Sequence, residues 1–362
     1  MTSSASTDVA DVIVVGGGIV GLAAARALAR AGASVLLSAP EHEGTATSAA
    51  AGVLCPTLDP HPGTAFDFAC AARDAFPSFS TELHEETGID VQLSLNGVVR
   101  VALDDADAAS LRAETSAQTR WIDAKELAEL EPSLEPCQGA RLHERDGIVA
   151  NERVHAALRA FVRAHRSIRW SSTPVSSVVP GDEPAVCLDN GHRWHARTVV
   201  LAAGAWTPKL LGTPAALAVT PGRGQSISIF APRLTRAVFA PQGYLTPRRD
   251  GRVFVGATLE SVGFDTSTTE DAVGSFRRLA KRLLGPAGDA EPLDRWAGIR
   301  PMTEDKLHLL GRDPRTPGVI YATGHSKNGI LMGPLTGDVV VRLASGEDPG
   351  FDLTPMRPDR FG

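Results

Sequence analysis

Several features that mark whole classes of protein are scarce or missing in this sequence. Its 362 residues include only four cysteines, with no Cys-x-x-Cys pair, which disfavours a zinc ribbon or a disulfide scaffold. No apolar run reaches the roughly 18 residues that a membrane-spanning helix needs. The net charge of −6 lacks the basic excess typical of nucleic-acid binding. We therefore expect no resident metal, no nucleic-acid partner and no membrane span.

The first residues also lack the features of an export signal. No basic stretch precedes a long apolar run, so a reduced, cytoplasmic protein is the expectation. The remaining composition, 43% hydrophobic and 22% charged, is that of an ordinary globular protein with enough apolar residues for a core. At about 100–200 residues per domain, the length favours two domains.

The chain begins with a pattern typical of a strand, a turn, a helix and a second strand. Residues 11–15 are a short β-branched run that suits a buried parallel strand. Residues 22–31 are rich in Ala, Leu and Arg, which favour a helix, and residues 33–38 again resemble a strand. This is a βαβ unit.

A G-x-G-x-x-G motif lies in the turn of this unit. Gly16 would allow the tight turn, Gly18 would let the backbone approach a pyrophosphate, and Gly21 would let the helix pack on the strand. Free N–H groups at the start of the helix would face the anion. The motif predicts a dinucleotide phosphate site, and the alternative is a glycine-rich turn that binds nothing.

The acidic residue expected at the end of the second strand is missing. In dinucleotide sites it binds the ribose about 20 residues after the motif. Here Ala39 and Pro40 occupy that place, with Glu41 and Glu43 just beyond. Either a displaced glutamate or a water makes the ribose contact, or the adenosine half is held more loosely.

The rest of the chain alternates between helical and hairpin-rich segments. Turn sequences predict hairpins around residues 189–191 and 249–251, and strands are expected at 98–103 and 319–323. The expected helices are 64–87 with a kink at Pro77, 105–116, 123–130, 149–164 with Asn151 as N-cap, and about 328–345. This order favours an α/β nucleotide-binding domain assembled from separate stretches, with a β-rich second domain inserted twice.

Further motifs select a family. They are the small-residue segment 45–54, Gly-Tyr-Leu-Thr-Pro-Arg at 243–248, Gly-Ala-Thr at 256–258, Trp-Ala-Gly-Ile-Arg-Pro at 296–301, and Ala-Thr-Gly-His-Ser-Lys-Asn-Gly-Ile-Leu at 322–331. In order and spacing, they resemble the glycine oxidase branch of the D-amino-acid oxidase family of FAD enzymes.

The resemblance implies a fold and a cofactor. It implies a Rossmann-like FAD-binding domain built from residues 8–85, 147–218 and 298–362, and an α+β substrate domain with a large antiparallel sheet built from 86–146 and 219–297. The FAD is expected to be noncovalent, since residues 45–54 offer no histidine and Cys55 is interpreted as a small buried thiol.

The cofactor residues implied by the resemblance fall into four groups along the FAD. They are Gly16, Gly18, Ile19, Val20 and Gly21 at the pyrophosphate; Thr47, Ser48, Ala51, Gly52 and Val53 along the pyrophosphate and flavin; Val175, Ala203 and Gly204 around the nucleotide; and His325, Ser326, Lys327, Asn328, Gly329, Ile330 and Leu331 at the flavin.

The last group has a physical interpretation of its own. A helix that begins near Asn328 would point its N–H groups at the flavin N1–C2=O edge and favour the anionic reduced ring. Gly329, Gly333 and Gly337 recur every four residues on one helix face, which predicts close packing. His325 is interpreted as structural or flavin-proximal, not as a catalytic base.

Arg300 and Tyr244 match the residues that hold the substrate carboxylate in the family. A guanidinium can form two parallel hydrogen bonds to a carboxylate, and the tyrosine hydroxyl would share it. The alternatives are an ion pair of Arg300 with Asp294 or Glu304, and a core aromatic role for Tyr244. Lys327, where glycine oxidases tend to carry arginine, is expected on the substrate side.

Two positions at the expected pocket rim weaken a transfer to glycine itself. They are Gln242 and Leu259, and Leu259 offers no counterpart to the lysine that activates oxygen in sarcosine-oxidase relatives. Oxygen use is therefore an expectation from the family and not from these residues.

The predicted function is FAD-dependent oxidative deamination of a small amino acid or amine. Arg300 and Tyr244 orient the substrate, a hydride passes from Cα to flavin N5, the imine hydrolyses, and O2 reoxidises the flavin to give H2O2. The alternatives are a flavin dehydrogenase that passes electrons to a partner, a noncatalytic flavin-binding subunit, and a nicotinamide dehydrogenase. A homo-oligomer is compatible with the sequence.

Overall fold

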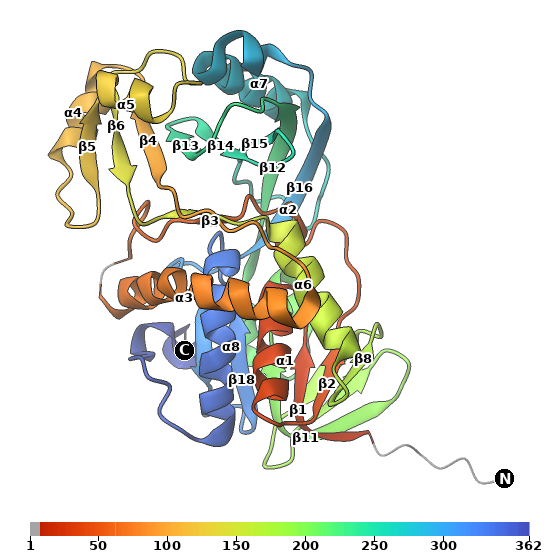
Figure 1. Ribbon diagram of the computed structural model, residues 1–362. Helices are drawn as coiled ribbons and strands as arrows, with labels where there is room; N and C mark the ends of the chain where they lie inside the picture. The colour runs from red at the N-terminus through yellow and green to blue at the C-terminus, as the bar shows by residue number, and fades with distance from the viewer. Residues whose placement is uncertain (1–7, 62, 362) are drawn as a thin grey trace.

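The computed structural model describes residues 8–61 and 63–361, and two large sheets dominate it (Figure 1). One sheet lies with helices α1, α3, α6 and α8 in the lower half of Figure 1, and the other lies with α7 in the upper half. Among the described residues, no helix combines the length and the apolar character needed to cross a membrane.

The lower sheet has a parallel centre of five strands. In spatial order its strands are β17 (Leu309–Arg312), β18 (Val319–Thr323), β11 (Arg193–Leu201), β1 (Val9–Val15), β2 (Val35–Ser38) and β8 (Ile168–Ser171), with β10 (Ala185–Leu188) and β9 (Val175–Val179) attached to β11. Along β1, Val12 and Val14 face the helices, whereas Ile13 and Val15 face the layer of β9 and β10. Burial on both faces explains why this strand is a continuous apolar run.

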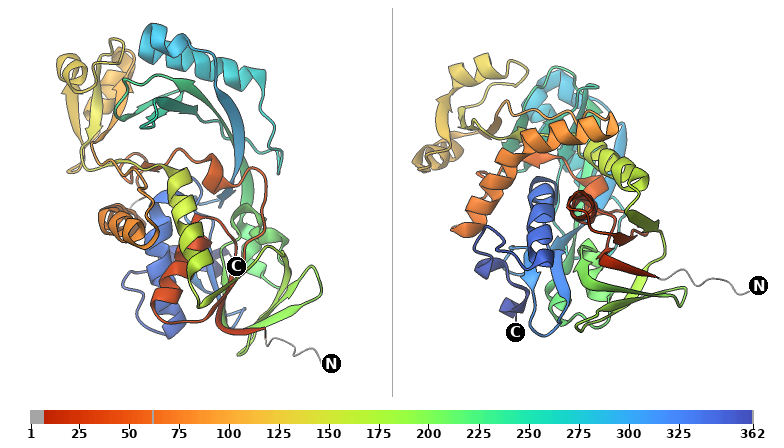
Figure 2. Two further views of the ribbon diagram at one scale, coloured as in Figure 1. Left: turned by 45° about the vertical axis from the view of Figure 1, so that its right-hand side comes forward. Right: turned by 60° about the horizontal axis from the view of Figure 1, so that its bottom comes forward.

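Four helices cover one face of this sheet. They are α1 (Ile19–Arg30), α3 (Thr64–Thr87), α6 (Asn151–Ala164) and α8 (Gly329–Ser345). The predicted βαβ unit, the 64–87 helix and the C-terminal helix are confirmed. Pro77 lies inside α3, and the helix changes direction along its length in the right-hand view of Figure 2.

The upper sheet is antiparallel except for one pair of strands. In spatial order it contains β16 (Asp294–Met302), β12 (Thr220–Phe230), β15 (Arg252–Gly256), β14 (Gly243–Pro247), β13 (Ala237–Ala240), β4 (Val98–Ala102), β6 (Gly139–His143) and β5 (Arg120–Asp123). The parallel pair is β13 and β4. The amphipathic helix α7 (Glu270–Leu284) packs its apolar side into the core of this sheet. The predicted α/β fold with a large antiparallel sheet is therefore confirmed.

Shorter elements complete the described chain. They are α2 (Ala46–Ala49), β3 (Val53–Leu54), α4 (Asp105–Ala113), α5 (Ala124–Leu130), β7 (Gly147–Ile148), and the 3-10 helices η1 (Gly204–Lys209), η2 (Pro214–Ala218), η3 (Gly285–Asp289), η4 (Thr354–Met356) and η5 (Pro358–Phe361). The predicted division into two domains stays a prediction, and β16 crosses its boundary at residue 298.

Two expectations about helix starts are corrected. Helix α1 begins at Ile19, three residues earlier than expected, because Gly21 fits inside its first turn against the Gly16 carbonyl. The N-cap of α6 is Ala150 and not Asn151. The Asn151 amide instead donates to the Thr47 carbonyl at 2.9 Å and accepts from Arg248 at 2.8 Å, so tertiary partners have taken the side chain that would cap the helix.

Candidate active site

A cavity of about 1320 Å³ lies between the two sheets. The glycine turn after β1, the start of α8, α2, β14 and β16 all contribute to its lining. Pockets for small ligands are typically about 300–1,000 Å³, so this one has room for an extended cofactor together with a substrate.

The glycine turn lines the cavity at the start of α1. Gly16 has a φ of 124°, and a Cβ there would lie 2.2 Å from the Ala202 carbonyl oxygen, so only glycine fits. Gly18 is the N-cap of α1, and the Ile19 N–H donates to the Thr47 hydroxyl at 3.0 Å. The next N–H groups of α1 lack intrahelical acceptors and are available to an anion.

Almost all predicted cofactor residues line this cavity. The exceptions are Gly21, which contacts the Gly16 carbonyl behind the turn, and Leu331, which is buried in the core. Gly52 has a φ of 70°, and a Cβ there would lie 1.9 Å from the Val149 carbonyl oxygen. The segment after α2 therefore depends on glycine to pass close to its neighbour.

Ala39 occupies the position at which a ribose-binding acidic residue is expected. Ala39 is buried and faces Gly17, where an added Cβ would lie 2.6 Å from the Ala39 Cβ. Glu41 lines the cavity and accepts from Arg159 at 2.9 Å, whereas Glu43 does not line it. Of the two glutamates, Glu41 is therefore the one placed to approach a ribose.

The start of α8 also lines the cavity, next to the start of α1. Asn328 is the N-cap without a side-chain cap bond, so the first N–H groups of this helix are open to the cavity side. His325 stacks on His308 with ring centres 4.6 Å apart, and its Nε2 lies 3.1 Å from the Thr336 hydroxyl. Burial lowers the pKa of His325 to about 3, so it is a neutral structural ring.

Arg300 reaches into the cavity from β16. Its Nη1 donates to the Thr258 carbonyl at 2.9 Å, and an added Cβ on Gly224 would lie 2.1 Å from the same nitrogen. Burial lowers the pKa of the guanidinium. Within the part of the chain that the structure describes, neither Asp294, Glu304 nor any other carboxylate forms an ion pair with it.

Tyr244 lies nearby on β14, and Lys327 lies at the start of α8. The Tyr244 ring packs on Phe239 with centres 5.5 Å apart, and both line the cavity. The half-exposed Lys327 ammonium lies 2.7 Å from an Asp59 oxygen. Arg300 and Tyr244 therefore line the same cavity, and the half-exposed Lys327–Asp59 ion pair lines it as well.

The two rim positions, Gln242 and Leu259, also line the cavity, and Leu259 is 62% exposed. Sequence reasoning missed Gly224, whose lack of a side chain makes room for the Arg300 guanidinium. The alternation Gly-Arg-Gly at 222–224 was the available clue.

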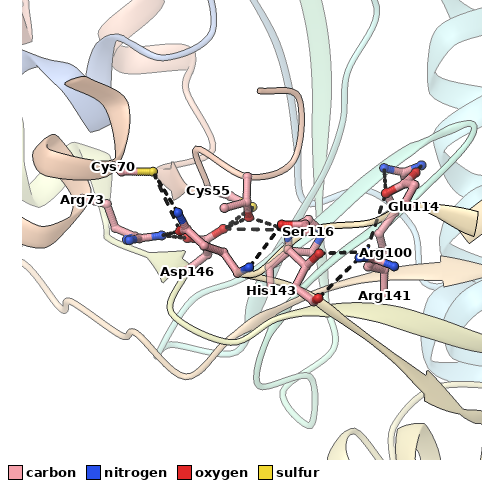
Figure 3. Close-up of polar contacts among 12 residues, drawn as sticks. Cys55, Cys70, Arg73, Arg100, Glu114, Ser116, Arg141, His143 and Asp146 are labelled. Carbon is pink, nitrogen blue, oxygen red and sulfur yellow. Dashed lines mark hydrogen bonds and ion pairs between the residues drawn. The ribbon is translucent and has the colours of Figure 1, made fainter. Parts of the chain in front are cut away.

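A buried polar cluster beside the cavity was also missed. Figure 3 shows Arg73, Cys55 and His143 directed toward Asp146. Asp146 accepts from Arg73 at 2.7 Å, from the Cys55 thiol at 3.0 Å and from the Thr57 hydroxyl. Thr57 also contacts His143 Nδ1 at 2.5 Å.

The donor atoms of Cys55, His143 and Asp146 lie within 4.8 Å of one another, as in a metal site. However, the hydrogen bonds of Asp146 are already filled, and the cationic Arg73 occupies one of its oxygens. Burial raises the pKa of the Cys55 thiol, so it stays protonated as expected for a buried thiol. We interpret the cluster as a hydrogen-bond network that ties α3 to the segment lining the cavity.

Comparisons with known proteins agree with this site. A family model described as FAD dependent oxidoreductase matches residues 11–343. A glycine oxidase of Geobacillus kaustophilus is 32% identical over 360 residues, covering 96% of each chain. A glycine oxidase of Pseudomonas aeruginosa is 33% identical over 359 residues, covering 96% of this chain and 98% of the relative.

Comparison of the fold with solved structures leads to the same family. The crystal structure of the Geobacillus kaustophilus glycine oxidase matches with a TM-score of 0.88 at 31% identity, covering 97% of this chain and 99% of that one. The predicted family, the FAD cofactor and the oxidoreductase class are thereby confirmed. The chain belongs to the family of FAD dependent oxidoreductases.

Proposed function

We propose that this protein oxidises the Cα–N bond of a small amino acid or amine through bound FAD. The relatives named glycine oxidase match almost the whole chain, and Arg300 with Tyr244 lines the same cavity as the glycine turn. A carboxylate anchor and a flavin site that share one cavity would support this reaction.

The unpaired Arg300 guanidinium carries this proposal. A charge that is largely removed from solvent without a partner is costly, and the described residues supply only the Thr258 carbonyl to this partly buried guanidinium. The remaining N–H groups match the two oxygens of a carboxylate. A substrate carboxylate is therefore the ligand that best completes the site.

The residues present fit FAD. Gly16 and Gly52 let the chain pass close to neighbouring backbone along the cavity wall, and the N-termini of α1 and α8 lie side by side at the cavity, where their N–H groups suit an anionic cofactor. When bound, FAD supplies the two-electron acceptor for the substrate. The chain's own task is to hold the carboxylate at Arg300 and Tyr244 so that Cα is correctly oriented.

Burial lowers the pKa values of two cavity histidines, His308 and His325, which makes both of them weak bases. His325 is neutral and bound to Thr336. In this proposal the substrate amine arrives in its neutral form, and its own lone pair assists the oxidation.

A panel of amino acids and amines with peroxide detection tests the proposal. Peroxide formation with small amino acids is the expected result, with O2 as the acceptor. Fast dye reduction with slow peroxide formation would indicate a dehydrogenase that passes electrons to a partner. Bound flavin that no amine or amino acid reduces would indicate a noncatalytic flavin-binding subunit.

Location and assembly belong to the proposal as well. The described structure leaves all four cysteines unpaired, which suits a reducing cytoplasm. Cell fractionation and light scattering of the purified protein test the location and the possibility of a homo-oligomer.

A further inference from the structure

The Thr258 carbonyl, which accepts a hydrogen bond from Arg300, belongs to the segment 257–260. Residues 257–260 follow β15 and run antiparallel beside β12, and Leu259 next to Thr258 is exposed. Backbone bonds of 2.9 Å join Arg223 and Glu260 in both directions. The segment is therefore attached at Glu260, two residues after the carbonyl that contacts Arg300.

The Glu260 side chain makes the strongest attachment. Its Oε1 accepts from the Thr258 hydroxyl at 2.5 Å and from the Gln225 amide at 2.7 Å, and its Oε2 accepts from Arg223 at 2.5 Å. The Thr258 hydroxyl in turn accepts from the Gln225 backbone N–H at 3.0 Å. One carboxylate thus connects the segment to two side chains of β12, those of Arg223 and Gln225, and also holds the Thr258 hydroxyl.

Successive residues of β12 point to opposite faces of the sheet, so one face contacts Arg300 and the other binds Glu260. Gly222 and Gly224 lie under Met302 and the Arg300 guanidinium, on the cavity side. Arg223 and Gln225, the residues between and beyond them, bind Glu260. Arg300 and the segment that holds it are therefore both positioned by the same four residues of β12, 222–225.

We propose that Glu260 is a positioning residue for the substrate carboxylate, acting on Arg300 through the Thr258 carbonyl. This inference rests on the proposed function, in which Arg300 binds that carboxylate. One N–H of the planar guanidinium is held by Thr258, so the direction of the remaining N–H groups is set before substrate arrives. Such preorganisation removes side-chain ordering from the cost of binding.

The carboxylate of Glu260 is suited to this task. Burial raises its pKa, but the hydrogen bonds from Arg223, Thr258 and Gln225 outweigh that effect and leave the pKa below its usual value. Arg223 also binds Asp265, Ser267 Oγ and the Ser267 carbonyl, so it keeps partners when Glu260 is replaced.

The test measures acetate binding to the FAD-loaded protein from the change in flavin absorption, together with kcat and KM. We expect Glu260→Ala and Thr258→Val each to weaken acetate binding and raise KM about tenfold, with kcat and FAD affinity nearly unchanged. Glu260→Gln keeps one oxygen for Thr258 and Gln225 and should recover part of the loss.

Asp265→Asn is the matched control, because it removes another Arg223 partner without contacting Thr258. Wild-type acetate affinity in both Glu260→Ala and Thr258→Val would overturn the inference, as would an equal loss in Asp265→Asn. In an Arg300→Leu background, Glu260→Ala should cause no further loss, and a further loss would also overturn it. If Arg300→Leu itself leaves acetate binding unchanged, the proposed function fails instead.

Discussion

Arg300 is a single side chain on which the substrate assignment depends. Removing one partner of a buried charge pair costs roughly 2–4 kcal/mol, which is about 30- to 1,000-fold in affinity. We expect Arg300→Leu to raise the KM for amino acids by that order while the spectrum of the bound flavin stays intact. Steady-state kinetics with an amino acid and a carboxylate-free amine measure the effect.

The control for this prediction is Arg300→Lys. It should recover only part of the affinity, since an ammonium cannot form two parallel bonds to a carboxylate. A substrate amine without a carboxylate should respond little to either change. An equal loss with both kinds of substrate would make Arg300 structural and the protein a plain amine oxidase.

A second residue-scale prediction concerns Ala39 and the affinity for FAD. It occupies the position at which a ribose-binding acidic residue is expected, and Glu41 forms an ion pair with Arg159. We expect preparations to lose FAD on dialysis, and Ala39→Glu to tighten FAD binding about tenfold by adding a charged acceptor. Fluorescence titration of the apoprotein with FAD gives the dissociation constant.

Glu43→Gln serves as the control, because Glu43 does not line the cavity and its loss should leave the dissociation constant unchanged. If Ala39→Glu has no effect while Glu41→Gln weakens binding, then Glu41 already makes the ribose contact.

At the scale of elements, the packing of α8 on α1 depends on glycine. An added Cβ at Gly337 would lie 2.8 Å from the Ala23 carbonyl oxygen, and one at Gly333 would lie 3.1 Å from Ile19. We expect Gly337→Ala to lower the free energy of unfolding by about 1–3 kcal/mol, because backbone atoms cannot easily yield. Thermal unfolding of the apoprotein measures this.

Gly274 on α7 provides a matched control for this prediction. An added Cβ there meets only the end of the flexible Arg278 side chain at 3.3 Å. Gly274→Ala should therefore stabilise the protein by about 0.5–1 kcal/mol through helix propensity. Similar changes in both variants would show that helix propensity, and not the contact of α8 with α1, decides the outcome.

For the whole molecule, the first prediction concerns the cofactor. Segment 45–54 beside the cavity has no histidine, and the Cys55 thiol is bound to Asp146, so neither offers a covalent bond to the flavin. We expect acid precipitation to release a yellow chromophore into the supernatant. Colour that stays in the pellet would contradict noncovalent binding, and a colourless protein that rejects added FAD would contradict the whole assignment.

The second whole-molecule prediction concerns acid stability. Burial lowers the pKa of His143 from its usual 6.5 to about 4, so the unfolded chain binds a proton in that interval that the folded protein resists. The contribution of neutral His143 is present above pH 6.5 and is lost as pH falls toward 4. Melting temperatures from pH 7 to 4 should fall less steeply in His143→Gln than in the parent protein. Parallel curves would contradict this.

The sequence by itself determined the elements and the cofactor end of the site. Local sequence patterns were enough to predict the β-branched run of β1, the glycine turn and the four-residue glycine spacing of α8. Each of these features depends on residues that are close together along the chain. Arg300 and Tyr244 were identified through motifs, and the structure places both in one cavity.

Only the tertiary structure decided which side chains meet across long separations. Asn151 has the residue type of a helix cap, yet Thr47 and Arg248 take its amide. Cys55 and Asp146 are 91 residues apart, and Arg300 depends on Gly224 and Thr258 from other strands. A buried polar group takes whichever partner the packing brings to it, and that partner is set by how the sheets and helices pack, which no local pattern records.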